Sequence, residues 1–151
     1  MHPIVVQMQP SQEQLPAVQE RGREVAVTAG AGTGKTRTLV ARYLSLISEG
    51  IDVRSIVAIT FTRKAAREMR NRVREEIRTY LDRLDPHAVE RTRWQAVYSR
   101  LDAAHIGTIH YLCSEILRAH PAEACIDPRF EVLDEGQANL LRVRAVEETM
   151  A

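Results

Sequence analysis

The stretch from residue 25 to 40, VAVTAGAGTGKTRTLV, constrains the fold of this chain more than any other segment. Its first five residues, Val25 to Ala29, are mostly apolar and predict a buried strand. A turn that contains three glycines follows, and Gly34 to about Ser48 then has the apolar spacing of a helix. The predicted apolar face of this helix consists of Leu39, Tyr43, Leu46 and Ile47. A strand that enters a helix through such a turn is typical of α/β proteins.

The turn between them follows the Walker A pattern, which is a glycine, any four residues and then Gly-Lys-Ser/Thr. Ala29 stands where the pattern has its first glycine. Glycines can take backbone angles that aim several N–H groups at one anion, and the next helix presents its positive end to that anion. In this pattern Lys35 reaches the β- and γ-phosphates of a nucleotide, and the Thr36 hydroxyl ligates Mg²⁺. The predicted phosphate loop consists of Ala29, Gly30, Ala31, Gly32, Thr33, Gly34, Lys35 and Thr36.

A coincidental Gly-Lys-Thr in a glycine-rich turn is the alternative, and the flanking strand and helix disfavour it. The loop does not name a reaction, because kinases, GTPases and motor proteins share it.

Composition and length set broader bounds. A chain of 151 residues with 44% apolar and 27% charged residues is long enough for one domain with a real core. Two cysteines, Cys113 and Cys125, are too few for a disulfide framework, and we expect them to be buried apolar thiols. The first residues hold an apolar run of only three, Ile4 to Val6, so we expect no signal peptide, no membrane span and a cytoplasmic protein.

Two further strands and a long helix are predicted. Ser55 to Phe61 is an apolar run typical of parallel sheets, and His105 to Ile109 is a shorter candidate. From Lys64 to about Leu84 the pattern predicts a long charged helix. Its apolar stripe would consist of Met69, Val73, Ile77 and Leu81. This strand and helix order predicts an α/β sheet with helices on its faces.

Shorter helices complete the prediction. Ser11 and Gln14 have the spacing of a capping box, so a short helix is expected near them. Asp85-Pro86 starts a helix that would carry Val89, Trp94, Val97 and Leu101. Tyr111 to Ala119 and the last 15 residues or so are predicted helices, and Phe130 to Leu133 is predicted to be extended.

Positive charge is concentrated in residues 63–83. This segment has eight basic and four acidic side chains, a balance of +4 in a chain whose net charge is +1. Such a surface attracts phosphate backbones. Phe61 and Thr62 lie at the carboxyl end of the preceding strand, where ligands of parallel sheets bind, and the phosphate loop is expected at the same edge. An exposed ring there could stack on a nucleobase. Two alternatives stay open: a solvated helix face with Arg/Glu pairs, and a core role for Phe61.

Four segments of the chain, taken in their order along the sequence, resemble the start of the UvrD/Rep-type superfamily 1 DNA helicases. Their residues are most similar to those of the AddA/RecB-like branch. The segments are PSQEQLPAV, AGAGTGKTRTLVAR, AITFTRKAAREMRNRV and HIGTIHYLCSEILRAHP with DPRFEVLDEGQ. They cover about residues 10 to 145. The resemblance implies a RecA-like, ATP- and Mg²⁺-dependent motor that acts on single-stranded and duplex DNA in repair and recombination, with 3′–5′ polarity and a nuclease-helicase partner subunit.

The resemblance also implies roles for residues at the nucleotide. Gln14 matches the glutamine that recognises adenine, and the alternative is that it only completes a helix cap with Ser11. Lys35 and Thr36 match the catalytic phosphate and Mg²⁺ positions. Arg37 matches a position close to the bound nucleotide.

Two further segments match elements that contact single-stranded DNA. Thr60, Phe61 and Thr62 match motif Ia, and Arg63 stands where many relatives have asparagine. Gly107, Thr108 and His110 match motif Ib. For His110 the alternative is a satisfied polar residue at the end of a strand.

The helicase machinery also needs a Walker B Asp-Glu pair and a second motor domain. Asp134-Glu135 is the only candidate pair, and we reject it because Glu131 precedes it where a buried central strand should be apolar. We therefore expect an amino-terminal piece that hydrolyses ATP hardly at all by itself. Residues 1–125 would form the first part of the ATP-binding domain 1A, and residues 126–151 would enter helical subdomain 1B. The alternative is a non-catalytic, helicase-derived module that binds DNA or a partner subunit.

Overall fold

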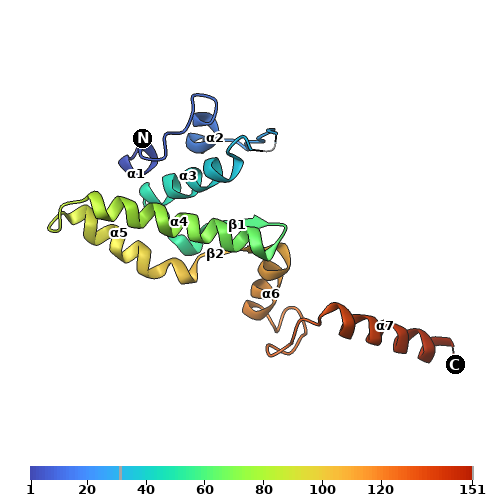
Figure 1. Ribbon diagram of the computed structural model, residues 1–151. Coiled ribbons are helices and arrows are strands. Elements are labelled where there is room, and N and C mark those ends of the chain that lie inside the picture. Colours follow the sequence, from blue (N-terminus) through green and yellow to red (C-terminus); the bar gives the residue numbers. More distant parts are fainter. Residues whose placement is uncertain (31, 151) are drawn as a thin grey trace. The chain divides into compact units, whose positions relative to one another are not determined.

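The computed structural model describes residues 1–30 and 32–150 (Figure 1). The chain divides into two compact units, Met1–Ile109 and His110–Ala151. The predicted boundary after residue 125, between domain 1A and subdomain 1B, stays a prediction.

The first unit is a mixed α/β structure whose two strands pair in parallel. Its elements are α1 (Pro3–Val6), α2 (Leu15–Gln19), α3 (Lys35–Ser48), η1 (Val53–Ser55), β1 (Val57–Thr60), α4 (Arg63–Arg83), α5 (Val89–Arg100), η2 (Leu101–Ala103) and β2 (His105–Thr108). The register pairs Val57 with His105 and Thr60 with Thr108. The long helices α4 and α5 form the crossover that a parallel pair requires, and they lie side by side (Figure 1). The predicted parallel sheet flanked by helices is confirmed at this level.

Helix α4 organises the core. Its predicted stripe of Met69, Val73, Ile77 and Leu81 is buried, with exposed fractions of 9% or less. Thr62 caps its first turn, because the Thr62 hydroxyl oxygen accepts a hydrogen bond of 3.1 Å from the backbone N–H of Ala65. Trp94 of α5 is fully buried and donates a 2.6 Å hydrogen bond from Nε1 to Glu90. The core therefore forms where α4 meets α5 and β2 on one side and α3 and α1 on the other.

The prediction of a strand over Val25 to Ala29 is wrong for this structure. These residues are exposed, with Val25 at 40% and Val27 at 53%, and no strand is assigned to them. A strand exists only through hydrogen bonds to a neighbouring strand, and among the described residues only β1 and β2 pair. The apolar side chains of β1 at Val57 and Ile59 are also about half exposed.

Several smaller predictions also differ. The thiols of Cys113 and Cys125 are exposed rather than buried, because α6 buries no residue and Cys125 lies in a turn. Leu39 and Val89 point to solvent with exposed fractions of 41% and 87%. Helix α1 is an addition to the predicted elements, and its Ile4 and Val5 are fully buried.

The second unit holds α6 (Ile109–Ala119, which begins at the last residue of the first unit) and α7 (Glu135–Met150). The residues from Phe130 to Leu133 between them form no strand. Asp134 and Gln137 cap α7 reciprocally: Asp134 N–H donates to Gln137 Oε1 at 3.1 Å, and Gln137 N–H donates to Asp134 Oδ1 at 2.8 Å. Asp134 therefore acts here as a helix cap.

Candidate nucleotide and nucleic-acid site

The glycine-rich loop adopts left-handed backbone angles at two positions. Gly32 has φ +77° and Gly34 has φ +83°, which L residues with a side chain rarely take. Gly34 is the N-cap residue of α3, and no side chain caps that helix. The first N–H groups of α3 are therefore directed at the loop without an intrahelical acceptor. This arrangement provides both the backbone donors and the positive helix end that an anion needs.

Lys35 is folded onto its own loop. Its Nζ donates a 2.7 Å hydrogen bond to the carbonyl oxygen of Ala29, and it also contacts the carbonyl oxygen of Gly30. Thr33 adds a 2.8 Å hydrogen bond from Oγ1 to the same Gly30 oxygen. The side chain of Lys35 is nevertheless exposed, so its ammonium lies at the surface of the loop.

Gln14 connects the short helix α2 to the loop. Its Oε1 accepts a 3.0 Å hydrogen bond from the backbone N–H of Ser11, in agreement with the capping-box spacing. Its Nε2 lies 3.4 Å from the carbonyl oxygen of Thr33 and would lie 3.2 Å from a Cβ atom added at Gly34. Gln14 therefore closes the turn that precedes α2 and borders the phosphate loop, while its side chain makes no cap hydrogen bond to α2 itself.

Thr36 and Arg37 are exposed in the first turn of α3. The Thr36 hydroxyl makes no hydrogen bond to any other described residue. Within residues 1–30 and 32–150, no group of three or more His, Cys, Asp or Glu side chains could hold a metal ion. A single hydroxyl fits Mg²⁺ that arrives with a nucleotide, because that ion keeps several waters and binds through few protein groups and the phosphates.

Arg37 borders a groove between α3 and α4. Met8, Val40, Arg72, Glu75 and Glu76 are the other residues that line it.

Ala31, which belongs to the predicted phosphate loop, lies outside the described residues.

The segments that match motifs Ia and Ib meet at the ends of the two paired strands. Thr60 pairs with Thr108, and Ile59 pairs with Gly107. Thr60 Oγ1 donates a 3.0 Å hydrogen bond to the carbonyl oxygen of Thr62, which fixes the turn into α4. Phe61 in that turn is completely exposed, at 103% of its reference area, so its predicted core alternative is wrong. The sheet thus places an aromatic ring in solvent at its carboxyl edge.

Gly107 is buried in β2, whereas the remaining predicted DNA residues, Arg63 and His110, are accessible. Arg63 is exposed at the first position of α4, beside the Thr62 cap. His110 is exposed in the second unit, and its carbonyl oxygen accepts a 2.9 Å hydrogen bond from Ser114 Oγ.

Arg21 is a structural residue that the sequence did not single out. Its guanidinium donates hydrogen bonds of 2.9 and 2.8 Å to the two carboxylate oxygens of Glu49 at the end of α3. It also donates to Ser45 Oγ at 2.6 Å and to the carbonyl oxygen of Val18 at 2.7 Å. These bonds fasten the segment that leads to the phosphate loop against α3. They lower the pKa of Glu49, with the hydrogen bond from Arg21 as the main cause.

Tyr43 is a second buried polar group of α3. Burial raises the pKa of its hydroxyl to about 12, and the negative charge of Asp52 adds to the effect. The hydroxyl has no hydrogen-bond partner among the described residues. The Tyr43 hydroxyl has no hydrogen bond to the loop, so its burial affects only the stability of the fold.

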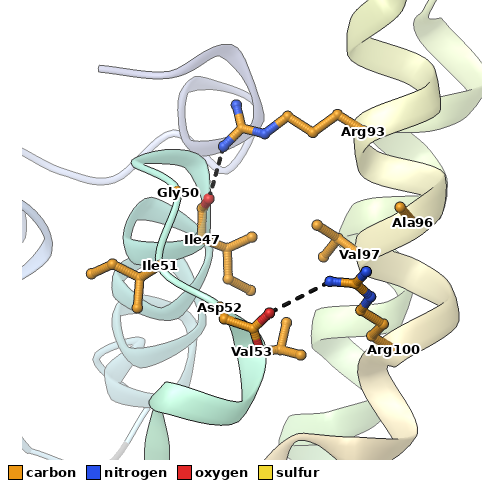
Figure 2. Close-up of a pocket in the computed structure, with 9 residues that line it drawn as sticks. All are labelled: Ile47, Gly50, Ile51, Asp52, Val53, Arg93, Ala96, Val97 and Arg100. Atoms are coloured by element: carbon orange, nitrogen blue, oxygen red, sulfur yellow. Dashed lines mark hydrogen bonds and ion pairs between the residues drawn. The ribbon is translucent and has the colours of Figure 1, made fainter.

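A groove of about 210 Å³ lies at the other end of α3 (Figure 2). Arg93 donates to the carbonyl oxygens of Ile47 and Ser48 at 3.0 and 2.8 Å, and Arg100 pairs with Asp52 at 3.5 Å. Both arginines are therefore engaged in closing the end of α3 and holding η1. The groove is about 20 Å along the helix from the phosphate loop, so it is no part of the nucleotide site.

The sequence of this chain matches known proteins over nearly its whole length. Residues 10–151 match the UvrD/REP helicase N-terminal domain. An ATP-dependent helicase/nuclease subunit of Lactobacillus johnsonii is 38% identical over 139 residues, which cover 91% of this chain and 11% of that protein. The ATP-dependent helicase/nuclease subunits of Lactobacillus gasseri and Pelotomaculum thermopropionicum are 39% and 40% identical, over 93% and 90% of this chain. They are covered over 12% and 11% of their own lengths.

The chain belongs to the UvrD/REP helicase N-terminal domain family. This confirms the family that the four sequence segments indicated. The chain spans about a tenth of the length of the curated relatives it matches. Among the helices that the structure describes, none has the length and apolar character to cross a membrane.

Proposed function

We propose that this chain forms the ATP-binding and single-stranded-DNA-contacting part of an ATP-dependent 3′–5′ DNA helicase of repair and recombination. Family membership over residues 10–151 is the observation that carries the proposal. The relatives from the two Lactobacillus species are ATP-dependent helicase/nuclease proteins by name. The whole protein would therefore act as a motor, with a nuclease-helicase partner subunit.

In this proposal the phosphate loop binds the β- and γ-phosphates of ATP. Lys35 would leave the carbonyl oxygens of Ala29 and Gly30 and pair with the phosphates, while the N–H groups at the start of α3 donate to them. Thr36 would hold Mg²⁺, which neutralises charge on the phosphates. Gln14 would use its amide to recognise the edge of adenine, since an amide both donates and accepts. Arg37 would lie near the nucleotide.

The DNA strand would cross the carboxyl edge of the sheet. Thr60, Phe61, Thr62 and Arg63 come from one strand and its turn, and Gly107 and Thr108 come from the strand paired with it. His110, in the second unit, is proposed as a DNA contact on its match to motif Ib alone. Phe61 would stack on a base, since nothing in the described chain covers its ring.

ATP hydrolysis by the purified chain, with and without single-stranded DNA, tests the catalytic side of the proposal. We expect Mg-ATP binding that depends on Lys35 and almost no turnover, because Asp134 caps α7 and no other Asp-Glu pair is available to orient water. DNA-stimulated turnover that Lys35→Ala abolishes would contradict this expectation and make Asp134 and Glu135 the suspects. Absence of Mg-ATP binding would instead favour a non-catalytic module that binds DNA or a partner subunit.

A further inference from the structure

Helix α4 carries five arginines on one side. Arg63, Arg67, Arg70, Arg74 and Arg78 follow one another at intervals of three or four residues. At 100° per residue they fall within an arc of about 80° of the helix surface. We call this set the arginine stripe. It extends over 15 residues, which is about 22 Å along the helix.

The inner members of the stripe are held by the fold. Arg70 donates a 2.7 Å hydrogen bond from Nη2 to the carbonyl oxygen of Ile106, and Arg74 pairs with Asp102. The outer members are not held. Arg63, Arg67 and Arg78 are exposed, and none of them forms an ion pair or hydrogen bond through its side chain with another described residue.

This arrangement is unfavourable for the helix itself. Residues four apart on a helix are neighbours, and like charges there destabilise the helix. The stripe contains three such pairs: Arg63 with Arg67, Arg70 with Arg74, and Arg74 with Arg78.

The acidic side chains of α4 do not neutralise the stripe. Glu68, Glu75 and Asp82 lie on the neighbouring arc of the helix, and no carboxylate of α4 lies within ion-pairing distance of a stripe arginine in the described chain. Asp102 from η2 is the one acidic group there that pairs with it. The surface therefore keeps unpaired cations at Arg63, Arg67 and Arg78, with the two engaged arginines between them.

We propose that the arginine stripe binds the sugar–phosphate backbone of single-stranded DNA and leads the strand from Phe61 along α4. The stripe begins at Arg63, two residues after Phe61, so the two sites are continuous. Its contacts go to phosphates and carry no base specificity. This inference rests on the proposed function, because it assigns a second segment of the path of the same strand.

Oligonucleotide length separates the two parts of the path. Binding of fluorescein-labelled oligo(dT) of about 5 and about 15 nucleotides is measured over a series of salt concentrations. The variant Arg67→Gln/Arg78→Gln removes two stripe charges, and Arg72→Gln/Arg83→Gln removes two charges from the opposite side of α4. All four side chains are exposed and unpaired among described residues, so both variants should fold like the parent.

For the long oligonucleotide, Arg67→Gln/Arg78→Gln should lower the slope of log K against log salt concentration by about 1.4, which is about 0.7 for each lost phosphate contact. The same variant should leave the slope for the short oligonucleotide unchanged. The variant Arg72→Gln/Arg83→Gln should leave the slopes for both oligonucleotides unchanged. Equal decreases of the slope in the two variants would overturn the inference, because binding would then depend on net charge and not on the position of the arginines. A duplex of about 15 base pairs is measured in the same way, and a loss of affinity confined to the duplex would overturn the assignment to a single strand.

The experiment distinguishes failure of the arginine-stripe inference from failure of the proposed function. Phe61→Ala could abolish binding of the short oligonucleotide while Arg67→Gln/Arg78→Gln binds the long oligonucleotide more tightly than the short one by the same factor as the parent chain. In that case the inference is wrong and the proposed function stands. If no oligonucleotide binds at low salt, both are wrong.

Discussion

The ammonium nitrogen of Lys35 lies 2.7 Å from the carbonyl oxygen of Ala29, six residues earlier at the start of the same loop. The side chain that is proposed to bind phosphate therefore closes the loop on itself. The exchange of carbonyl oxygens for phosphate oxygens would strengthen the contact, because the ammonium would then face negatively charged rather than neutral acceptors.

Lys35→Ala should weaken Mg-ATP binding about 10- to 100-fold, since one charged hydrogen-bonding group contributes about 1.5–3 kcal/mol. Titration with a fluorescent ATP analogue measures the change. Lys64→Ala is a matched control, because Lys64 is the chain's only other lysine and is exposed on α4. Equal affinity of Lys35→Ala and the parent chain would exclude the loop as the phosphate site.

Gln14→Ala should reduce the preference for ATP over GTP by up to about 10-fold, because one neutral hydrogen bond to adenine contributes about 0.5–1.5 kcal/mol. Competition between the two nucleotides gives the ratio directly. Gln12→Ala is the control, since Gln12 is exposed two residues away and has no contact with the loop. An unchanged ratio would leave Gln14 with its observed contacts to Ser11 and Thr33 alone.

Arg21→Gln should destabilise the fold by about 1–2 kcal/mol at neutral pH, after allowance for the solvent exposure of the pair. The pKa of Glu49 is lowered by Arg21, so the stabilisation is present above the ordinary pKa of 4.5 and disappears as the pH falls through the lower folded-state value. Thermal unfolding between about pH 7 and pH 3 should therefore show a higher unfolding temperature for the parent chain than for Arg21→Gln, and this difference should become smaller in acid. Arg54→Gln, which changes an exposed and unpaired arginine, should show no such trend.

Tyr43→Phe should leave stability at pH 7 unchanged or slightly raised, because it removes a buried hydroxyl without a partner in the described chain. The folded-state pKa is raised to about 12 from 10, so the protonated form stabilises the fold below pH 10 and this contribution is lost as the pH rises toward 12. The parent chain should lose stability in alkali more steeply than Tyr43→Phe. Parallel losses in the two chains would contradict the assignment, and Tyr98→Phe provides an exposed control.

Much of the fold near the site follows from local patterns. Lys35 to Ser48 is a helix because periodicity, a glycine start and a glycine stop agree, and α4 buries the stripe that its spacing predicts. The parallel pairing of β1 and β2 follows from two apolar runs with long helices between them. The local sequence also indicates the loop, whose left-handed angles occur at Gly32 and Gly34.

Other features depend on partners that are distant in the sequence. Val25 to Ala29 has strand composition, but composition supplies no neighbouring strand to pair with it. Helix α1 is too short to show a period, and its Ile4 and Val5 are buried only because α3 and α4 pack on them. The role of Arg21 depends on Glu49, 28 residues away, and nothing in the spacing of the two residues indicates it.

Phe61 provides the most direct test of the DNA site. The ring is fully exposed, so Phe61→Ala should not change the unfolding temperature, whereas loss of a stacked base should weaken binding of a short oligo(dT) by about 5- to 100-fold. The control is Phe130→Ala at the chain's only other phenylalanine, whose ring lies 5.1 Å from the Arg118 guanidinium in the second unit. That variant should alter local stability and leave oligonucleotide affinity unchanged. If both variants bind the short oligonucleotide as the parent does, stacking on Phe61 is excluded and the turn between β1 and α4 has another role.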